Sequence, residues 1–391
     1  MASTVWKGAL VGPTAPVQLE DVPEPDLPSP RWVRVRTRLC GICGSDVKIV
    51  RIRGAIDNPI TPFISFPHVL GHEGVGEVAE LGTGVTRVRV GQRILLNPWL
   101  SCEPRAIEPP CPPCAAGNVS LCRNFARGAL PPGIHSGNNS LVNGPFAPSF
   151  IAHESQCVPI PDDVEWEQAV TGDPFSVSFH GILIRPPEDG QTVLVYGCGT
   201  LGLLAIHALK ALWPRTRVLA AYRYEHQKEL ALRLGADAAF PARPVGGLLE
   251  AVAQATDARI HPPWFGRAML MGGVDVVYDT VADPETVEIS IRVARERGTV
   301  VLIGMEAAKR FEWSPIMFKE LTVTGSMAFG GETFEGRRAH AMEHYLDLVR
   351  AGRVDARPIL THRFPLDDWR VAFATLLDKG RTRAVKAVFT F

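Results

Sequence analysis

The sequence predicts an α/β protein in which a β-rich part precedes a doubly wound parallel sheet. Residues 190–330 alternate short apolar runs with helix-forming stretches, the pattern of parallel strands joined by helices. A glycine-rich turn at 197–202 links the first of these strands to a helix. Residues 5–160 read instead as short strands separated by Pro- and Gly-rich segments. A chain of 391 residues is long enough for two such domains.

The composition and net charge of the chain argue against nucleic acid and membranes as its binding partners. Lys plus Arg and Asp plus Glu both number 41, so nothing favours nucleic acid or an anionic membrane. No apolar run approaches the roughly 18 residues of a membrane span, and the N-terminal residues lack an apolar signal core. We therefore expect a cytoplasmic protein, whose eight cysteines are not in the first place disulfides.

The β-rich part is expected to hold several short strands. Trp32 to Leu39 alternates apolar with basic residues, as a half-buried strand does. Residues 51–68 are irregular and partly apolar, and we expect a loop over a site. Segment 98–133 is rich in Pro and Cys and shows no periodicity. Further strands are expected at 5–11, 17–22, 69–82 and 88–96.

The second half begins with an expected helix over 164–183, which ends before Pro186. Buried strands are then expected at 193–196, 217–222, 274–278, 299–303 and 321–325, with helices that end at Trp213 and span 226–234. The tail is expected to form helices at 337–351 and 366–379 and a strand at 384–391.

The glycine-rich turn has the spacing of a dinucleotide-binding fingerprint. Gly197 permits the tight turn, Gly199 lets a pyrophosphate approach the backbone, and Gly202 allows the helix to pack close to the strand. The helix N-terminus, which begins near Thr200 and Leu201, offers free N–H groups to the phosphates. A tight turn without a ligand is the alternative, and the pattern of strands and helices that follows disfavours it.

The preferred nicotinamide cofactor is predicted from the end of the second strand. NAD enzymes place an acidic residue about 20 residues past the fingerprint, but this sequence has Tyr222 followed by Arg223. An arginine there can pair with the 2′-phosphate of NADP. Glu225 is the one nearby acid and supports NAD. We therefore expect NADP(H) to be favoured over NAD(H).

Four cysteines in the Pro-rich segment have the spacing of a structural zinc site: Cys102, Cys111, Cys114 and Cys122. The segment lacks an apolar face that could order it by packing. Four free thiols, or disulfides formed by oxidation, are the alternative.

A second group is scattered along the chain: Cys43, His72, Glu73 and Asp173. No local spacing rule joins these residues. Taken alone, Cys43 reads as a buried thiol and His72 as a core histidine.

The motifs taken together resemble the zinc-dependent medium-chain dehydrogenases, which include alcohol, polyol and threonine dehydrogenases. The resemblance rests on Cys43-Gly-Ser-Asp46, on Gly71-His72-Glu73-Gly, on the four-cysteine segment and on the later glycine fingerprint, in that order. It covers nearly the whole chain. It implies a GroES-like catalytic domain at 1–163 and 332–391 and a Rossmann dinucleotide-binding domain at 164–331.

The resemblance also implies roles for single residues. Cys43 and His72 match the first two ligands of a catalytic zinc, and the third, usually Cys or Glu, falls on Asp173. Because Asp is shorter than Glu, three arrangements are open: Asp173 binds the metal directly, Asp173 binds it through a water molecule, or Glu73 is the ligand. Asp46 matches a carboxylate that orients the ligands.

Two further positions follow from the same match. Ser45 matches the hydroxyl that relays the substrate proton. Lys48 stands where the family often has His, and it either substitutes for that residue, binds an anionic group of the substrate or is simply solvated.

The expected function is zinc-dependent hydride transfer between a nicotinamide cofactor and an alcohol or carbonyl substrate. The alternatives are a C=C or C=N reductase in which the catalytic zinc is absent or non-essential, and a non-catalytic nucleotide-sensing protein. The apolar stretch Leu321 to Met327 reads as a sheet edge, so we expect a homodimer or homotetramer.

Overall fold

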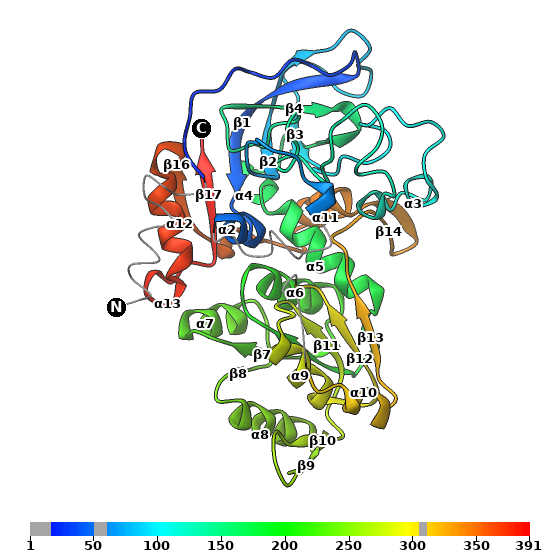
Figure 1. Ribbon diagram of the computed structural model, residues 1–391. Helices are drawn as coiled ribbons and strands as arrows, with labels where there is room; N and C mark the ends of the chain where they lie inside the picture. The colour runs from blue at the N-terminus through cyan, green and yellow to red at the C-terminus, as the bar shows by residue number, and fades with distance from the viewer. Residues whose placement is uncertain (1–16, 51–60, 305–310) are drawn as a thin grey trace. The chain divides into compact units, whose positions relative to one another are not determined.

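The computed structural model describes residues 17–50, 61–304 and 311–391 (Figure 1). The chain divides into two compact units. Unit 1 comprises Met1–Asp173, Thr333–Arg350 and Leu360–Phe391, and unit 2 comprises Pro174–Glu332 and Ala351–Ile359. No helix in the described part of the chain is long and apolar enough to cross a membrane.

Unit 1 is built on a seven-stranded sheet with the order β16-β17-β1-β2-β3-β5, in which β4 also pairs with β1. Its strands are β1 (Trp32–Gly41), β2 (Glu73–Leu81), β3 (Arg93–Leu96), β4 (Ser149–His153), β5 (Cys157–Pro159), β16 (Leu360–Pro365) and β17 (Lys386–Thr390). The predicted strand 32–39 is therefore confirmed as β1. Its alternating pattern buries Val33 and Val35 against Phe150 of β4 and Val78 of β2.

The other strands of this part begin later than the sequence suggests. Residues 69–72 precede β2, and residues 88–92 precede β3, as turns and irregular chain. The strand predicted at 17–22 is wrong, because these residues are irregular and leave Leu19 46% and Val22 56% exposed. They pair with no strand in the described part of the chain, although Val17 packs against the core cluster that includes Phe389 of β17. The strand predicted at 5–11 lies outside the described residues.

The segment 98–133 is irregular, as predicted, with only a short helix α3 (Pro112–Ala115) and a 3₁₀ turn η2 (Val119–Leu121). Arg105 orders it from within. Its fully buried guanidinium donates five hydrogen bonds of 2.7–3.0 Å, to the carbonyl oxygens of Leu100, Arg127, Leu130, Pro131 and Gly133. The segment also has apolar contacts that the sequence did not predict, because Leu100 and Leu130 pack in a buried cluster with Trp32 and Ile151, and Arg105 adds a polar centre to it.

Unit 2 contains a six-stranded sheet with the order β13-β12-β11-β6-β7-β8. The strands, all parallel, are β6 (Thr192–Tyr196), β7 (Arg217–Tyr222), β8 (Ala238–Pro241), β11 (Val274–Asp279), β12 (Ala294–Leu302) and β13 (Thr322–Gly325). The predicted α/β class with a doubly wound sheet is confirmed. The chain leaves β6 toward β8 and later returns to β11 on the other side of β6, which creates a topological switch point between β6 and β11.

The helices of unit 2 are α5 (Gly172–Ile184), α6 (Thr200–Leu212), α7 (Glu225–Arg233), α8 (Val245–Thr256), α9 (Pro284–Val293) and α10 (Ser314–Phe318). Because such crossovers are right-handed, α6 and α7 cover one face of the sheet and α9 the other (Figure 1). A hairpin of β9 (Arg259–His261) and β10 (Met269–Met271), which the sequence did not predict, follows α8.

Three of the predicted helices are divided. The stretch 164–183 contains α4 (Trp166–Ala169) and α5, and it breaks at Val170-Thr171. The stretch 337–351 begins with β15 (Arg337–His340), which pairs with β14 (Gly331–Phe334), and only then forms α11 (Ala341–Arg350). The stretch 366–379 contains the 3₁₀ turn η5 (Leu366–Asp368) and α12 (Trp369–Leu377), and α13 (Lys379–Thr382) follows.

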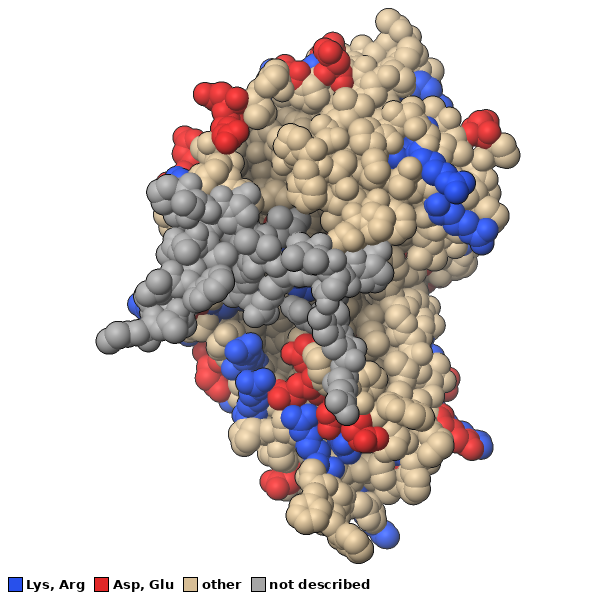
Figure 2. Space-filling view, in the orientation of Figure 1, with Lys and Arg blue, Asp and Glu red and all other residues tan. Residues whose placement is uncertain are grey.

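Charged side chains of both signs are scattered among neutral ones on the face shown in Figure 2. This distribution agrees with equal numbers of acidic and basic residues in the sequence. Like the balanced composition, it gives no support to nucleic acid or an anionic membrane as a partner.

Candidate active site and metal centres

Strand register brings Cys43 and His72 together although 28 positions separate them. Strands β1 and β2 are antiparallel, and Gly41 at the end of β1 lies opposite Glu73 at the start of β2. Cys43 follows β1 and His72 precedes β2, so both side chains lie at the same edge of the sheet. Donor atoms of Cys43, His72 and Glu73 lie within 4.8 Å of one another.

Asp46 holds the first two of these residues in place. Its Oδ2 atom accepts a 2.8 Å hydrogen bond from the backbone N–H of Cys43, and its Oδ1 atom lies 3.6 Å from Nδ1 of His72. The Nδ1 atom of His72 is buried and has no hydrogen-bond partner among the described residues. Because Asp46 faces Nδ1, the other ring nitrogen of His72 and the Cys43 thiol would be the atoms that bind a borderline-soft metal ion such as zinc.

Asp173 lies in the first turn of α5 and is buried, but its carboxylate is not in the group of donor atoms around Cys43. Burial and the negative charge of Glu73 raise the pKa of Asp173 to about 7. No ion pair joins Asp173 to another described residue. A buried carboxylate in this state would gain from a nearby cation.

The carboxylate of Glu73, in contrast, is paired with the ammonium group of Lys386. Lys386, from β17, donates hydrogen bonds to Glu73 and to the carbonyl oxygen of Ile42. Both side chains of the pair are only 2% exposed. Gly41 makes room for it, because an added Cβ there would lie 2.0 Å from Oε2 of Glu73. The sequence analysis missed Lys386, for which a lysine within the alternating apolar strand 384–391 was the only signal.

Ser45 and Lys48 both lie on α2 (Gly44–Val50), directly after Cys43, and both are half-buried. The short helix therefore carries Ser45, Asp46 and Lys48 in the immediate vicinity of the candidate ligand Cys43.

His135 is a further residue of this region that sequence reasoning did not identify. Its ring lies against that of His72, with 4.6 Å between the ring centroids and 42° between the ring planes, and meets the edge of Trp99 at 6.0 Å. Burial, together with the positive charge of His72, lowers the pKa of His135 to about 3. His135 belongs to an irregular, Pro- and Gly-rich stretch, where no periodicity could have pointed to it.

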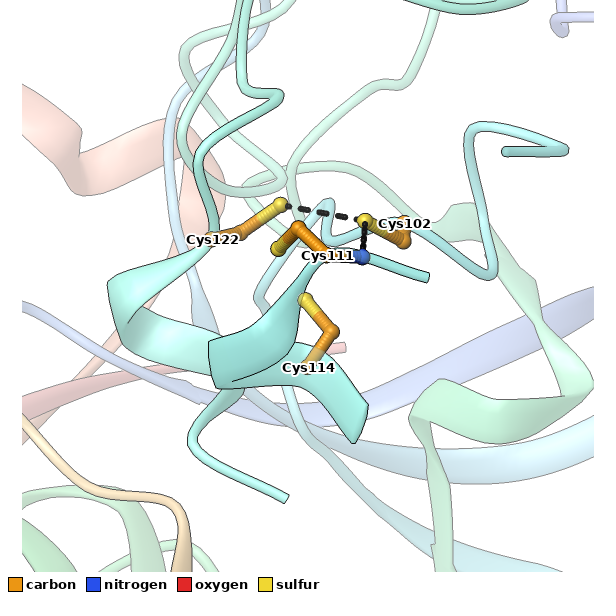
Figure 3. A group of neighbouring side chains, drawn as sticks. All are labelled: Cys102, Cys111, Cys114 and Cys122. Atoms are coloured by element: carbon orange, nitrogen blue, oxygen red, sulfur yellow. Dashed lines mark hydrogen bonds between the residues drawn. The ribbon is translucent and has the colours of Figure 1, made fainter. Parts of the chain in front are cut away.

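The four cysteines of the Pro-rich segment converge on one point (Figure 3). Their sulfur atoms lie within 4.8 Å of one another, and Sγ of Cys102 is 3.7 Å from Sγ of Cys122. N–H groups donate to these sulfurs, among them those of Cys111 and Asn124. Donors of this kind stabilise thiolates, so the cluster fits a closed tetrahedral zinc site.

The remaining three described cysteines outside both groups, Cys40, Cys157 and Cys198, are separate buried thiols. This is the role that we expect of small apolar side chains in a core.

The turn between β6 and α6 has the geometry of a phosphate-binding loop. Gly197 has φ +95°, and an added Cβ on Gly202 would lie 1.8 Å from the carbonyl oxygen of Gly197. The fold itself therefore requires both glycines. An added Cβ on Gly199, in contrast, would have no described atom within 4 Å. Close approach of a ligand to the backbone would account for this glycine.

The end of β7 holds the residues expected to bind the adenosine ribose. Tyr222 donates a 2.9 Å hydrogen bond from its hydroxyl group to Glu225, which also lies 3.6 Å from Nζ of Lys228. Arg223 is exposed, and its guanidinium carbon lies 5.5 Å from the centre of the Tyr224 ring. Both side chains are exposed, and Glu225 in addition contacts Tyr222 and Lys228.

Comparison with known proteins agrees with this architecture. Residues 29–162 match the alcohol dehydrogenase GroES-like domain, and residues 200–344 match the zinc-binding dehydrogenase domain. A protein of Neosartorya fischeri named "Probable D-xylulose reductase A" is 30% identical over 359 residues, which cover 91% of this chain and 89% of that protein.

Solved structures show the same fold. A short chain alcohol dehydrogenase of Escherichia coli complexed with NADH has a TM-score of 0.76 and 26% identity, over 96% of this chain and 97% of that one. A zinc-binding dehydrogenase of Sinorhizobium meliloti bound to NADP has a TM-score of 0.73 and 26% identity, over 97% and 98% of the two chains. The chain therefore belongs to the zinc-containing medium-chain dehydrogenase/reductase family, the zinc-dependent, NAD(P)-linked alcohol dehydrogenases, with a GroES-like domain and a Rossmann-like parallel sheet.

Proposed function

We propose that the enzyme interconverts a secondary alcohol of the polyol class and its ketone, with a catalytic zinc bound by Cys43, His72 and Asp173. The observation that carries this proposal is the convergence of Cys43 and His72 at the edge of the β1–β2 pair, beside a buried carboxylate. The similarity to D-xylulose reductases supports the polyol class. A zinc ion supplies Lewis-acid chemistry there, by polarising the oxygen of the alcohol or carbonyl.

Asp173 is favoured over Glu73 as the third ligand because of the charges around the two carboxylates. Lys386 balances Glu73, whereas no described cation pairs with Asp173. The position of Glu73 within 4.8 Å of the other donors supports the opposite choice. Measuring the zinc content of two variants decides between Asp173 and Glu73 as the third ligand. Asp173→Asn should lose the catalytic zinc, and Glu73→Gln should keep it. The reverse result would make Glu73 the ligand.

The side chains of the chain itself would orient the ligands and move a proton. Asp46 fixes the ring of His72 and the backbone of Cys43 through the contacts described above. Ser45 would carry the proton of the substrate hydroxyl toward solvent. Lys48 either takes part in this relay or binds an anionic group of the substrate. A pH–rate profile that Lys48→Ala leaves unaltered would reduce Lys48 to a solvated side chain.

The second unit is proposed to bind NADP(H) in preference to NAD(H). The phosphates would bind at the turn that includes Gly197, Gly199, Thr200, Leu201 and Gly202. Arg223 supports the choice of NADP, because it is exposed at the end of β7 and its planar guanidinium suits a 2′-phosphate. Glu225 is the nearby acid that supports the alternative, NAD(H), and its exposed carboxylate already accepts a hydrogen bond from Tyr222.

Nicotinamide oxidation and reduction tests the central proposal. The zinc-loaded enzyme is assayed with xylitol and simple secondary alcohols, and in reverse with the matching ketones. Cys43→Ala should abolish turnover while the melting temperature changes little, because the residue lies outside the apolar core. Near wild-type turnover in this variant would contradict the zinc-dependent mechanism and favour the C=C or C=N reductase. Cys40→Ala, at a buried thiol of β1, is the matched control.

The sheet edge of unit 2 supports a homodimer or homotetramer. Strand β13 ends the described sheet, and Trp313, Met317 and Phe318 beside it are 60–69% exposed. Exposed apolar side chains next to the open edge of a sheet are characteristic of interfaces between subunits. A monomeric mass by light scattering at micromolar concentration would contradict this assignment. We also propose that the enzyme acts in the cytoplasm, where its free thiols would stay reduced.

A further inference from the structure

The ring of His135 is placed where it can reach a bound substrate. It lies 4.6 Å from the ring of His72, centroid to centroid, and His72 is a proposed ligand of the catalytic metal. A substrate whose reacting oxygen binds beside His72 therefore brings its next carbon within reach of His135. We propose that His135 hydrogen-bonds the hydroxyl group on the carbon next to the reacting one, so that the enzyme selects vicinal diols and polyols over monohydric alcohols. This inference rests on the proposed function and assigns a specificity-determining residue to it.

The hydrogen bonds of His135 leave one ring nitrogen available. Nδ1 lies 2.5 Å from the carbonyl oxygen of Ser136, which can only accept, so Nδ1 carries the hydrogen of this bond. No hydrogen bond joins Nε2 to any residue in the described part of the chain. A hydroxyl group can both donate and accept, and it is therefore a suitable partner for Nε2.

The backbone around His135 is held on both sides, which fixes the ring before substrate binds. The N–H group of His135 donates to Oδ1 of Asn138 at 3.0 Å, and its carbonyl oxygen accepts from the N–H group of Asn138 at 3.2 Å. Ser136 donates its N–H to the carbonyl oxygen of Pro98, and Leu100 donates to that of Ile134. A ring fixed in this way loses little entropy on binding a hydroxyl group.

The neighbours of His135 are mainly aromatic, so its free nitrogen stands out as a polar group. Trp99 is 93% buried, meets the edge of His135 and also contacts Phe125, with 6.4 Å between those ring centroids. In such surroundings a hydrogen bond to the substrate discriminates strongly, because a substrate without the hydroxyl group leaves the nitrogen unpaired.

The test compares two substrates that differ by one hydroxyl group, 2,3-butanediol and 2-butanol, with xylitol as a longer polyol. His135→Phe keeps a ring against His72 and Trp99 but removes both nitrogens. His153→Phe is the matched control. His153 is likewise a buried histidine of unit 1, its ring meets the edge of Trp32 at 5.8 Å, and its Nδ1 atom bonds Ser155. Zinc content and calorimetric binding of xylitol to the zinc- and cofactor-loaded enzyme are measured beside kcat/KM.

We expect His135→Phe to lower kcat/KM for 2,3-butanediol and xylitol by about tenfold to 100-fold, as the loss of one buried hydrogen bond does. The value for 2-butanol should change less than about threefold. Xylitol binding should weaken in parallel, at unchanged zinc content, and His153→Phe should leave the ratio between the two butanols as it is. Equal losses for both butanols, or a loss of zinc, would overturn the inference and leave His135 as a structural support of His72. The inference would also be overturned if His135→Phe kept wild-type kcat/KM values for both butanols and therefore the same ratio between them.

A different result would contradict the proposed function. A wild-type enzyme without activity toward any alcohol or ketone would contradict the dehydrogenase assignment itself. A wild-type enzyme that oxidises both butanols, with a ratio that His135→Phe leaves unchanged, would contradict only the inference about His135.

Discussion

Lys386 and Glu73 form a fully buried ion pair that joins the last strand of the chain to the start of β2. Removing one partner of such a pair leaves an uncompensated charge in the interior, which costs about 3–5 kcal/mol. We therefore predict that Lys386→Met lowers the free energy of unfolding by about this amount. Chemical denaturation of the zinc-loaded enzyme measures the change.

The double variant Glu73→Gln/Lys386→Met is the control for this pair. It removes both charges, so it should be more stable than Lys386→Met alone. A double variant that is less stable than the single one would mean that Lys386 acts through its hydrogen bond to Ile42 rather than through Glu73.

Arg105 is predicted to hold the four-cysteine segment together. Lysine keeps the charge but cannot reproduce five hydrogen bonds to carbonyl oxygens. Arg105→Lys should therefore lower the melting temperature and speed the release of zinc to a chelator. Arg123→Lys, at an exposed position of the same segment, should change neither. If Arg105→Lys and Arg123→Lys had the same melting temperature and the same rate of zinc release, the hydrogen bonds of Arg105 would not stabilise the segment measurably.

The cysteine cluster is predicted to hold a structural zinc ion. Metal analysis of Cys111→Ser should find about one zinc ion per chain fewer than in the wild type, and the melting temperature should fall. Cys157→Ser, at a separate buried thiol, should keep the full zinc content. Unchanged zinc and an unchanged melting temperature in Cys111→Ser would rule out this site.

Glu154 should make stability depend on pH in the acid range. Burial disfavours its ionisation, but the N–H groups of Thr86 and Arg87 and the guanidinium of Arg31 outweigh this and lower its pKa from 4.5 to about 2. Because the pKa is lower in the folded chain, the stabilisation is complete above about pH 4.5 and disappears as the pH falls toward about 2.

The measurement compares wild type with Glu154→Gln. The variant should be less stable at neutral pH, and the difference between the two urea midpoints should shrink from about pH 5 to about pH 3. A difference that stays constant over this range would mean that packing around Glu154, not its charge, supplies the stabilisation.

Arg223 is predicted to set the cofactor preference. Arg223→Ala should lower kcat/KM for NADP(H) by about tenfold, the loss of one charged contact to phosphate, and leave NAD(H) nearly unchanged. A wild-type preference for NAD(H), or an undiminished efficiency with NADP(H) in the variant, would place the ribose site elsewhere. Arg233→Ala, at an exposed position later in α7, is the control.

Local pattern alone determined much of this protein. The glycine spacing of 197–202, the apolar runs of the parallel strands and the close spacing of Cys111, Cys114 and Cys122 are short-range features. Backbone sterics and the period of the side chains therefore predicted the strand–turn–helix unit and the class of the fold. The strand at 17–22 was predicted wrongly because alternation cannot show whether a partner strand exists.

The tertiary structure decided which distant residues meet. Cys43 and His72 lie together because β1 and β2 pair in a register that sets Gly41 opposite Glu73. Lys386 reaches Glu73 because β17 pairs with the same strand β1, and His135 reaches His72 across an irregular segment ordered by Arg105. These contacts depend on strand pairing and on the hydrogen bonds of buried polar groups, which join residues far apart in the chain and leave no periodic signal in the sequence.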